Sequence, residues 1–180
     1  ALTPDAAGTL LAERFGVTGT LRLLDGYRDL NFRVDADDGR RFVFKIYNPS
    51  EIRAFIDLQD TAMRRLADAG IEGCPKPVGT DEAAGSIIRL LTWVDGTSLA
   101  DIRPHDIDLL EDVGRLVGRV DKVLADLDHR DANCELEWDP RHIHETVTER
   151  LSDIDDPSRR ALINRRIGWA EGVATRLAGL

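Results

Sequence analysis

The sequence is poor in cysteine, in long apolar runs and in positive charge, and each shortage excludes a class of protein. Its two cysteines, Cys74 and Cys134, stand apart without a metal-binding spacing, so we expect reduced thiols in a cytoplasmic protein. No apolar run is long enough to span a bilayer. Only 24 Lys and Arg face 33 Asp and Glu, and the formal net charge of −9 argues against nucleic acids or anionic membranes as partners.

Helical and strand patterns are both present, which predicts an α+β fold. The 180 residues are 42% hydrophobic and 32% charged, as in a globular protein with one domain or two small lobes. Caps, turn residues and apolar periodicity predict the following elements: a helix between Thr3 and Gly16; strands near 19–25, 31–36 and 41–47; a helix near 51–69, capped by Asn48-Pro49-Ser50-Glu51; extended segments near 75–79 and 86–93; and helices near 106–127, 140–153 and from 157 onward.

Lys45 is the most informative residue, because it lies inside the apolar, strand-like run 41–47. A charge in such a run is costly unless a partner compensates it. One interpretation is a lysine whose stem covers apolar surface while its ammonium stays in water. The other is a functional ammonium held by an acid of the next helix, which offers Glu51, Asp57 and Asp60. Asp57 lies in the middle of that helix, where its side chain can reach back toward the sheet.

Two more segments have both an ordinary and a functional interpretation. Gly26 opens a turn that runs to Asn31; hairpins need glycine and asparagine favours turns, but such a loop can also cover phosphate groups. Residues 90–96 are a buried strand that ends in a linker. This segment is either an ordinary connection to a helix or a source of exposed backbone groups for an adenine ring.

Taken in their order and spacing, these segments resemble the aminoglycoside phosphotransferase superfamily over roughly residues 8–175. Within it, the sequence is most similar to the hydroxylysine kinase group and to kinase domains fused to class III aminotransferases. The matching segments are Gly26 to Asn31, Val43-Phe44-Lys45-Ile46, Ile56-Asp57-Leu58-Gln59, Gly70-Ile71 with Pro75 and Pro77, Leu91-Thr92-Trp93-Val94-Asp95-Gly96, Val117-Gly118-Arg119-Val120-Asp121 and Trp138-Asp139-Pro140-Arg141.

This resemblance implies an architecture of two lobes. Residues 1–93 would form a protein-kinase-like N-lobe, with a five-stranded antiparallel sheet and a helix. Residues 94–97 would be a hinge, and residues 98–180 would be an incomplete helical C-lobe that lacks the catalytic loop.

The resemblance also implies a nucleotide site, with ATP as the cofactor, Mg²⁺ beside it in the complete enzyme, and a small molecule as the phosphate acceptor. Lys45 would contact the α- and β-phosphates, and Asp57 would position Lys45. Gly26 to Asn31 would fold over the phosphates, while Thr92 and Val94 would present backbone groups to adenine.

One motif of the family is missing from the sequence. The family's catalytic loop has the form His-x-Asp-x-x-x-x-Asn, and its Asn, with a later Asp, holds Mg²⁺. His129-Arg130-Asp131 matches only the start, because the fifth residue after Asp131 is Leu136, which cannot bind a metal. We therefore expect a polar loop here, no catalytic residue in the chain, and a truncated or processed fragment that is inactive alone.

The residues leave three functions open. The first is the ATP-binding portion of a phosphotransferase acting on a hydroxyl of an amino alcohol or hydroxy amino acid. The second is a non-catalytic nucleotide-binding or regulatory module attached to another enzyme, such as a class III aminotransferase. The third is an interaction domain that binds no nucleotide.

An incomplete helical lobe would leave an apolar helix face open. We therefore predict self-association through Trp169, Val173 and Leu177 of the last helix. Light scattering over a range of concentrations should show a mass above that of a monomer. A monomeric mass at high concentration would contradict this prediction.

Overall fold

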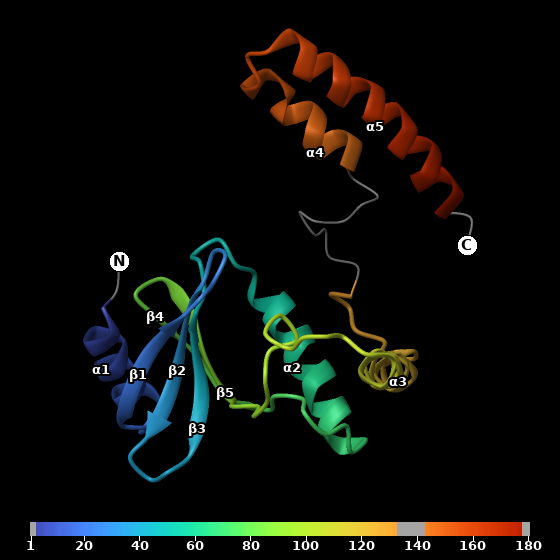
Figure 1. The fold of residues 1–180 in the computed structure, drawn as a ribbon. Coiled ribbons are helices and arrows are strands. Elements are labelled where there is room, and N and C mark those ends of the chain that lie inside the picture. Colours follow the sequence, from blue (N-terminus) through green and yellow to red (C-terminus); the bar gives the residue numbers. More distant parts are fainter. Residues whose placement is uncertain (1–2, 133–142, 178–180) are drawn as a thin grey trace. The chain divides into compact units, whose positions relative to one another are not determined.

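The computed structural model describes residues 3–132 and 143–177, and the chain divides into two compact units after Ala132. The first unit contains, in order, α1 (Pro4–Phe15), β1 (Gly19–Leu24), β2 (Leu30–Ala36), β3 (Arg41–Ile46), α2 (Arg53–Asp68), β4 (Pro77–Ala83), β5 (Ser86–Thr92) and α3 (Ile107–Leu124) (Figure 1). The second contains α4 (Ile143–Arg150), a 3-10 turn (Leu151–Asp153) and α5 (Pro157–Leu177).

One five-stranded sheet organises the first unit. Its strand order is β1-β2-β3-β5-β4, and all neighbouring strands are antiparallel. The predicted α+β class and five-stranded antiparallel sheet are thus confirmed. The register places Asn31, Lys45 and Arg89 side by side on three successive strands. Two cations therefore lie next to each other near the middle of the sheet.

The sheet face that α1 covers carries the main core. Alternate residues of β2 and β3 are buried, as the two-residue period of a strand requires. Phe32, Val34, Phe44 and Leu90 form one cluster with Leu11 of α1.

Local capping signals fix where α1 begins and ends. The Thr3 side chain accepts a hydrogen bond from the Ala6 amide, and Pro4 occupies the first helical position. Gly16 ends the helix in the left-handed conformation, as the sequence predicted.

The opposite sheet face is partly covered by α2, and Figure 1 shows α1 and α2 on opposite sides of the sheet. Ile56 of α2 packs with Tyr47 and Ile87 in a second, smaller cluster. Beside this cluster the Asp60 carboxylate pairs with the Arg89 guanidinium, and the side chains are only 8% and 1% exposed. Arg89 also donates to the Tyr47 hydroxyl oxygen at 3.1 Å and to Gln59 at 3.0 Å.

The predicted cap of α2 is wrong. The helix begins at Arg53 after Ile52, which makes no side-chain capping bond. The Asn48 side chain instead accepts bonds from the backbone amide and the hydroxyl of Ser50. These bonds close a separate turn, because a short polar side chain satisfies the nearest backbone donor.

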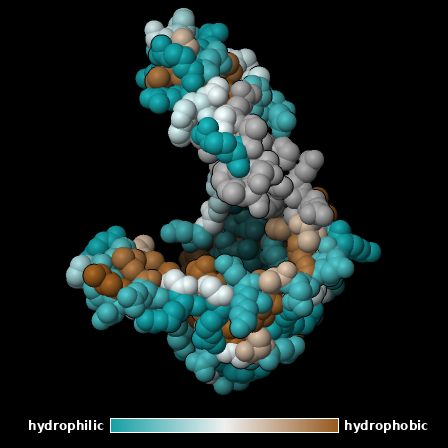
Figure 2. All heavy atoms as spheres, turned by 90° about the vertical axis from the view of Figure 1, so that its right-hand side faces the viewer, coloured by the Kyte–Doolittle hydropathy of each residue, from teal (hydrophilic) through white to brown (hydrophobic). Residues whose placement is uncertain are grey.

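α3 packs against α2 and presents much of its apolar face to solvent. The side of the first unit that carries α3 faces the viewer in Figure 2, where hydrophobic atoms lie at the surface among hydrophilic ones. The exposed apolar side chains of α3 are Ile107, Leu110, Val113, Leu116 and Val117. The predicted hinge at 94–97 lies inside this first unit, so the division into lobes at that point stays a prediction.

In the second unit, α4 and α5 pack on each other. Trp169 is 68% exposed, while the side chains of Val173 and Leu177 lie outside the described residues. The predicted self-association therefore stays a prediction. Among the described residues, no helix is long and apolar enough to cross a bilayer.

The ion pair between Asp60 and Arg89 generates a prediction about stability. Asp60→Ala leaves a buried guanidinium without its carboxylate, and this should lower the free energy of unfolding by about 3–5 kcal/mol. Asp57→Ala on the same helix removes an exposed pair with Arg53 and should cost less than about 1 kcal/mol. Urea unfolding followed by circular dichroism measures both. Equal effects from the two substitutions would contradict the prediction.

Candidate functional site

Lys45 lies near the end of β3 and points away from the α1 core. Its neighbours Phe44 and Ile46 face that core, so alternation along the strand turns Lys45 to the opposite face. Its ammonium lies 3.4 Å from a carboxylate oxygen of Asp29 and 4.8 Å from the ring centroid of Tyr47. The side chain is 25% exposed, so the ammonium is held in place and still reachable from solvent.

Asp29 is the partner that the sequence interpretation missed. It lies in the loop between β1 and β2, and its side chain is 19% exposed. Its second carboxylate oxygen accepts a hydrogen bond from the Asn48 amide at 3.1 Å. One signal for it existed in the sequence. Asp29 precedes Asn31, the cross-strand neighbour of Lys45, by two residues, so it comes just before the strand that pairs with the lysine.

The helix acid expected to position Lys45 lies elsewhere. Asp57 accepts a hydrogen bond from Arg53 at 3.1 Å on the exposed side of α2. The α2 acid that faces the sheet is Asp60, and it pairs with Arg89. The structure therefore does not bring Asp57 to Lys45, and the role given to Asp57 stays a prediction.

The loop that begins at Gly26 lies close to Lys45. A Cβ atom on Gly26 would stand 2.5 Å from the Asp29 carbonyl oxygen and 2.6 Å from the Asn31 side-chain nitrogen, so this tight approach requires glycine. Asn31 is the cross-strand neighbour of Lys45. The structure thus gathers Gly26, Asn31 and Lys45 in one place and adds Asp29 to them, and the assignment of these residues to a nucleotide stays a prediction.

Arg33 continues the same sheet face toward the linker after β5. Its guanidinium pairs with Asp35 at 2.7 Å and lies 5.1 Å from the centroid of the Trp93 ring. At this distance the guanidinium and the indole ring form a cation–π contact. Arg33 pairs across the strands with Val43, which lies two residues before Lys45 on β3, so Arg33 and Lys45 lie on the same sheet face. This face therefore offers both a cation and an aromatic surface.

Thr92 and Val94 flank Trp93, and only one of them has a free amide. The Thr92 amide donates to the Lys76 carbonyl at 2.9 Å, which leaves only its carbonyl to consider for a ligand. Within the described part of the chain, no hydrogen bond involves the backbone of Val94. A double ion pair between Arg41 and Asp95, with both contacts at 2.6 Å, fixes the linker directly after Val94.

The cluster is suited to binding an anion and offers nothing for a metal. A lysine ammonium with free donor capacity on a partly buried face is a typical phosphate contact. Across residues 3–132 and 143–177, no group of three or more His, Cys, Asp or Glu side chains is placed to hold a metal ion. The residues described therefore do not fit a Mg²⁺ site.

Other reactive residues lie apart from this cluster. His129, Arg130 and Asp131 form a polar turn after α3, in which the His129 ring accepts from the Asp131 amide at 3.2 Å and Arg130 pairs with Asp131. Burial raises the pKa of the Cys74 thiol, which keeps it protonated and makes it a poor nucleophile. Cys134 and Leu136 lie outside the described residues.

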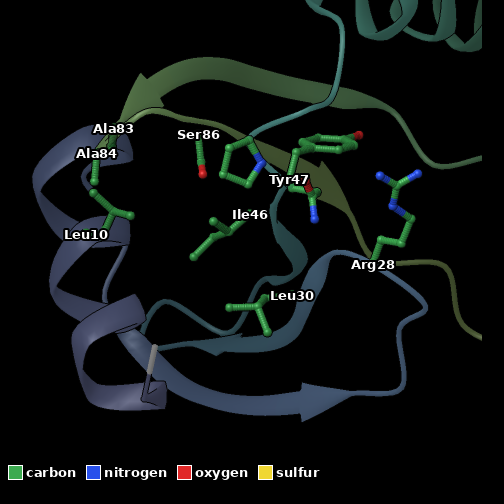
Figure 3. Close-up of a pocket in the computed structure, with 10 residues that line it drawn as sticks. Leu10, Arg28, Leu30, Ile46, Tyr47, Ala83, Ala84 and Ser86 are labelled. Carbon is green, nitrogen blue, oxygen red and sulfur yellow. The ribbon is translucent and has the colours of Figure 1, made fainter. Parts of the chain in front are cut away.

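A pocket of about 310 Å³ opens near the same end of the sheet but on the α1 side. Figure 3 shows Leu30 and Ile46 within it, Leu10 and Ala84 toward one end and Arg28 toward the other. Lys45 does not line this pocket. Its apolar lining suits side-chain packing more than phosphate binding, so the open face around Lys45 remains the candidate site.

Comparison with known proteins shows the family of this chain. The model of a phosphotransferase enzyme family, APH, matches residues 20–176. The chain is 33% identical over 131 residues to a hydroxylysine kinase of Danio rerio, an alignment that covers 64% of this chain and 37% of that protein. It is 30% identical over 148 residues to a hydroxylysine kinase of Xenopus laevis, covering 70% and 39%. The chain thus spans well under half the length of these curated relatives.

The fold has a counterpart among solved structures. An amicoumacin kinase, hAmiN, in complex with AMP-PNP, Ca²⁺ and Ami superposes with a TM-score of 0.64 at 18% identity, covering 89% of this chain and 48% of that one. At this identity the likeness shows a shared fold. Together with the match over residues 20–176, it confirms the resemblance inferred from the sequence, and the chain belongs to the APH phosphotransferase enzyme family.

Proposed function

We propose that this chain is the ATP-binding portion of a small-molecule phosphotransferase that acts on a hydroxyl group of an amino alcohol or a hydroxy amino acid. The observation that carries the proposal is the placement of Lys45. Its ammonium is held by Asp29 and the Tyr47 ring on an open sheet face, beside a loop that only glycine permits at position 26. The names of the two relatives, both hydroxylysine kinases, support this acceptor class.

Each residue near Lys45 has a role in this proposal. Lys45 binds the α- and β-phosphates, and the loop from Gly26 to Asn31 covers them. The Thr92 carbonyl and the Val94 amide bind adenine. The second of these assignments is supported by the lack of any hydrogen bond to Val94 among the described residues.

ATP itself supplies the transferable phosphate when it is bound, and this chain's residues hold and orient it. An ammonium fixed before binding loses less conformational freedom when it meets a phosphate. The AMP-PNP in the amicoumacin kinase complex supports a nucleotide as the ligand of this fold. The complete enzyme would use Mg²⁺, whose ligands are not among the residues described here.

In a second possible function, the chain binds a nucleotide but catalyses no phosphate transfer. The chain would then be a non-catalytic nucleotide-binding or regulatory module attached to another enzyme, such as a class III aminotransferase. One observation favours it: His129-Arg130-Asp131 forms a turn closed on itself, and Leu136 stands where a metal-binding Asn is needed.

Nucleotide binding tests the proposal through Lys45. Lys45→Met should weaken Mg-ATP about 10- to 100-fold in calorimetry, because a charge-assisted bond to phosphate is lost. Lys122→Ala on α3 removes the same charge from an exposed position and should leave the affinity within about twofold. If the wild-type chain does not bind Mg-ATP, the proposal is wrong and the third interpretation, an interaction domain without nucleotide, is favoured.

Turnover is expected to be absent from these residues alone. The chain lacks the family's His-x-Asp-x-x-x-x-Asn loop, so it should bind Mg-ATP without transferring phosphate to hydroxylysine or related amino alcohols. A coupled assay for ADP release measures this. Steady ADP formation that depends on the acceptor would show that the chain carries its own catalytic residues.

A further inference from the structure

We propose that Asp29, in the loop between β1 and β2, is the acid that positions Lys45 for the phosphates of a nucleotide. This inference deepens the proposed function and rests on it. Asp29 would be a positioning residue, because it acts on the ligand through Lys45.

The first argument is the geometry around the ammonium. A lysine has three N–H donors. The Asp29 carboxylate forms an ion pair with the ammonium on one side at 3.4 Å, and the Tyr47 ring centroid lies 4.8 Å away. These two contacts restrict the long, flexible side chain. Donor capacity remains on the exposed side, where a phosphate oxygen can approach.

The second argument is that Asp57 and Asp60 of α2 are already engaged. Asp60 pairs with the buried Arg89 and lies 3.3 Å from Arg64. Moving Asp60 to Lys45 would leave the Arg89 guanidinium buried without its charge partner, which is strongly unfavourable. Asp57 pairs with Arg53 on the exposed side of the helix. Asp60 of α2 therefore pairs with Arg89 on β5, and Lys45 pairs with Asp29 of the loop.

The third argument is that Asp29 is itself held firmly. Its other carboxylate oxygen accepts from the Asn48 amide at 3.1 Å, and its carbonyl lies against Gly26. One carboxylate oxygen of Asp29 thus accepts a hydrogen bond from the backbone after β3, and the other pairs with the Lys45 ammonium. Because Asp29 belongs to the loop that would cover the phosphates, the position of that loop and the position of the ammonium are linked.

Asp29→Asn separates positioning from simple charge. The substitution keeps an oxygen that can accept from the Asn48 amide and removes the negative charge beside Lys45. A carboxylate near the phosphates repels them, so its removal would tighten Mg-ATP if Asp29 had no positioning role. Positioning predicts the opposite sign. Calorimetry should show Mg-ATP binding weakened about five- to tenfold and adenosine binding, which needs no phosphate contact, changed less than about twofold.

Two further variants complete the experiment. Asp29→Glu keeps the charge and should bind Mg-ATP within about threefold of the wild type. Asp68→Asn, at the exposed end of α2, removes the same charge away from the cluster and should change neither affinity. Circular dichroism, with amide exchange at Asn48, shows whether the variants keep the native loop.

The outcomes separate this inference from the function on which it rests. Weaker Mg-ATP binding in Asp29→Asn, unchanged adenosine binding and recovery in Asp29→Glu support the inference. If the wild type and Lys45→Met differ as expected but Asp29→Asn binds Mg-ATP equally well or more tightly, the inference alone is overturned. The same holds if Asp57→Asn weakens binding and Asp29→Asn does not.

A wild-type chain that binds neither ligand overturns the proposed function and this inference with it. If Asp29→Asn fails to fold, Asp29→Ser takes its place: weaker Mg-ATP binding with adenosine binding retained supports the inference, and unchanged Mg-ATP binding or equal loss of both ligands overturns it.

Discussion

The buried pair of Asp60 and Arg89 determines how the rest of the first unit is arranged. Strand register sets Arg89 beside Lys45, so two positive charges share one sheet face. Arg89, which has almost no access to water, pairs with the Asp60 carboxylate of α2, and this contact holds the helix against the sheet. The more exposed Lys45 then depends on the loop for its acid. In this arrangement the carboxylate of α2 pairs with Arg89 and the carboxylate of the loop pairs with Lys45.

The sheet and its order of elements could be predicted because their signals are local. Alternation buries Phe32 and Phe44 on one face, and the residues that begin and end α1 act within one helical turn. The family resemblance added the pairing of distant strands, which no local pattern contains. Local reasoning failed at the start of α2, where the Asn48 side chain accepts from the amide and hydroxyl of Ser50 in a separate turn and does not cap the helix.

The contacts of the candidate site were harder to predict, because they depend on register between strands and on the rotation of a helix. Gly26, Asn31 and Lys45 do lie together, as their order suggested. The partner of Lys45 was assigned to Asp57 because spacing alone does not give the rotation of α2 about its axis. The position of Arg89 in the sequence indicates which acid of α2 faces the sheet. A cation inside a buried strand requires an acid, and Asp60 follows the buried Ile56 by four residues, on the same helical face.

The double ion pair between Arg41 and Asp95 has a mechanical consequence for the linker. It joins the first residue of β3 to the chain just beyond β5, so the backbone through Asp95 is an extension of the sheet and should move with it. Gly96 follows immediately, and a Cβ placed on it would meet no atom within 4 Å. Bending of the linker should therefore concentrate at Gly96, one residue past the clamp, while the stretch that carries Trp93 and Val94 keeps its shape. The pivot would then lie outside the stretch to which we assign adenine binding in the proposed function.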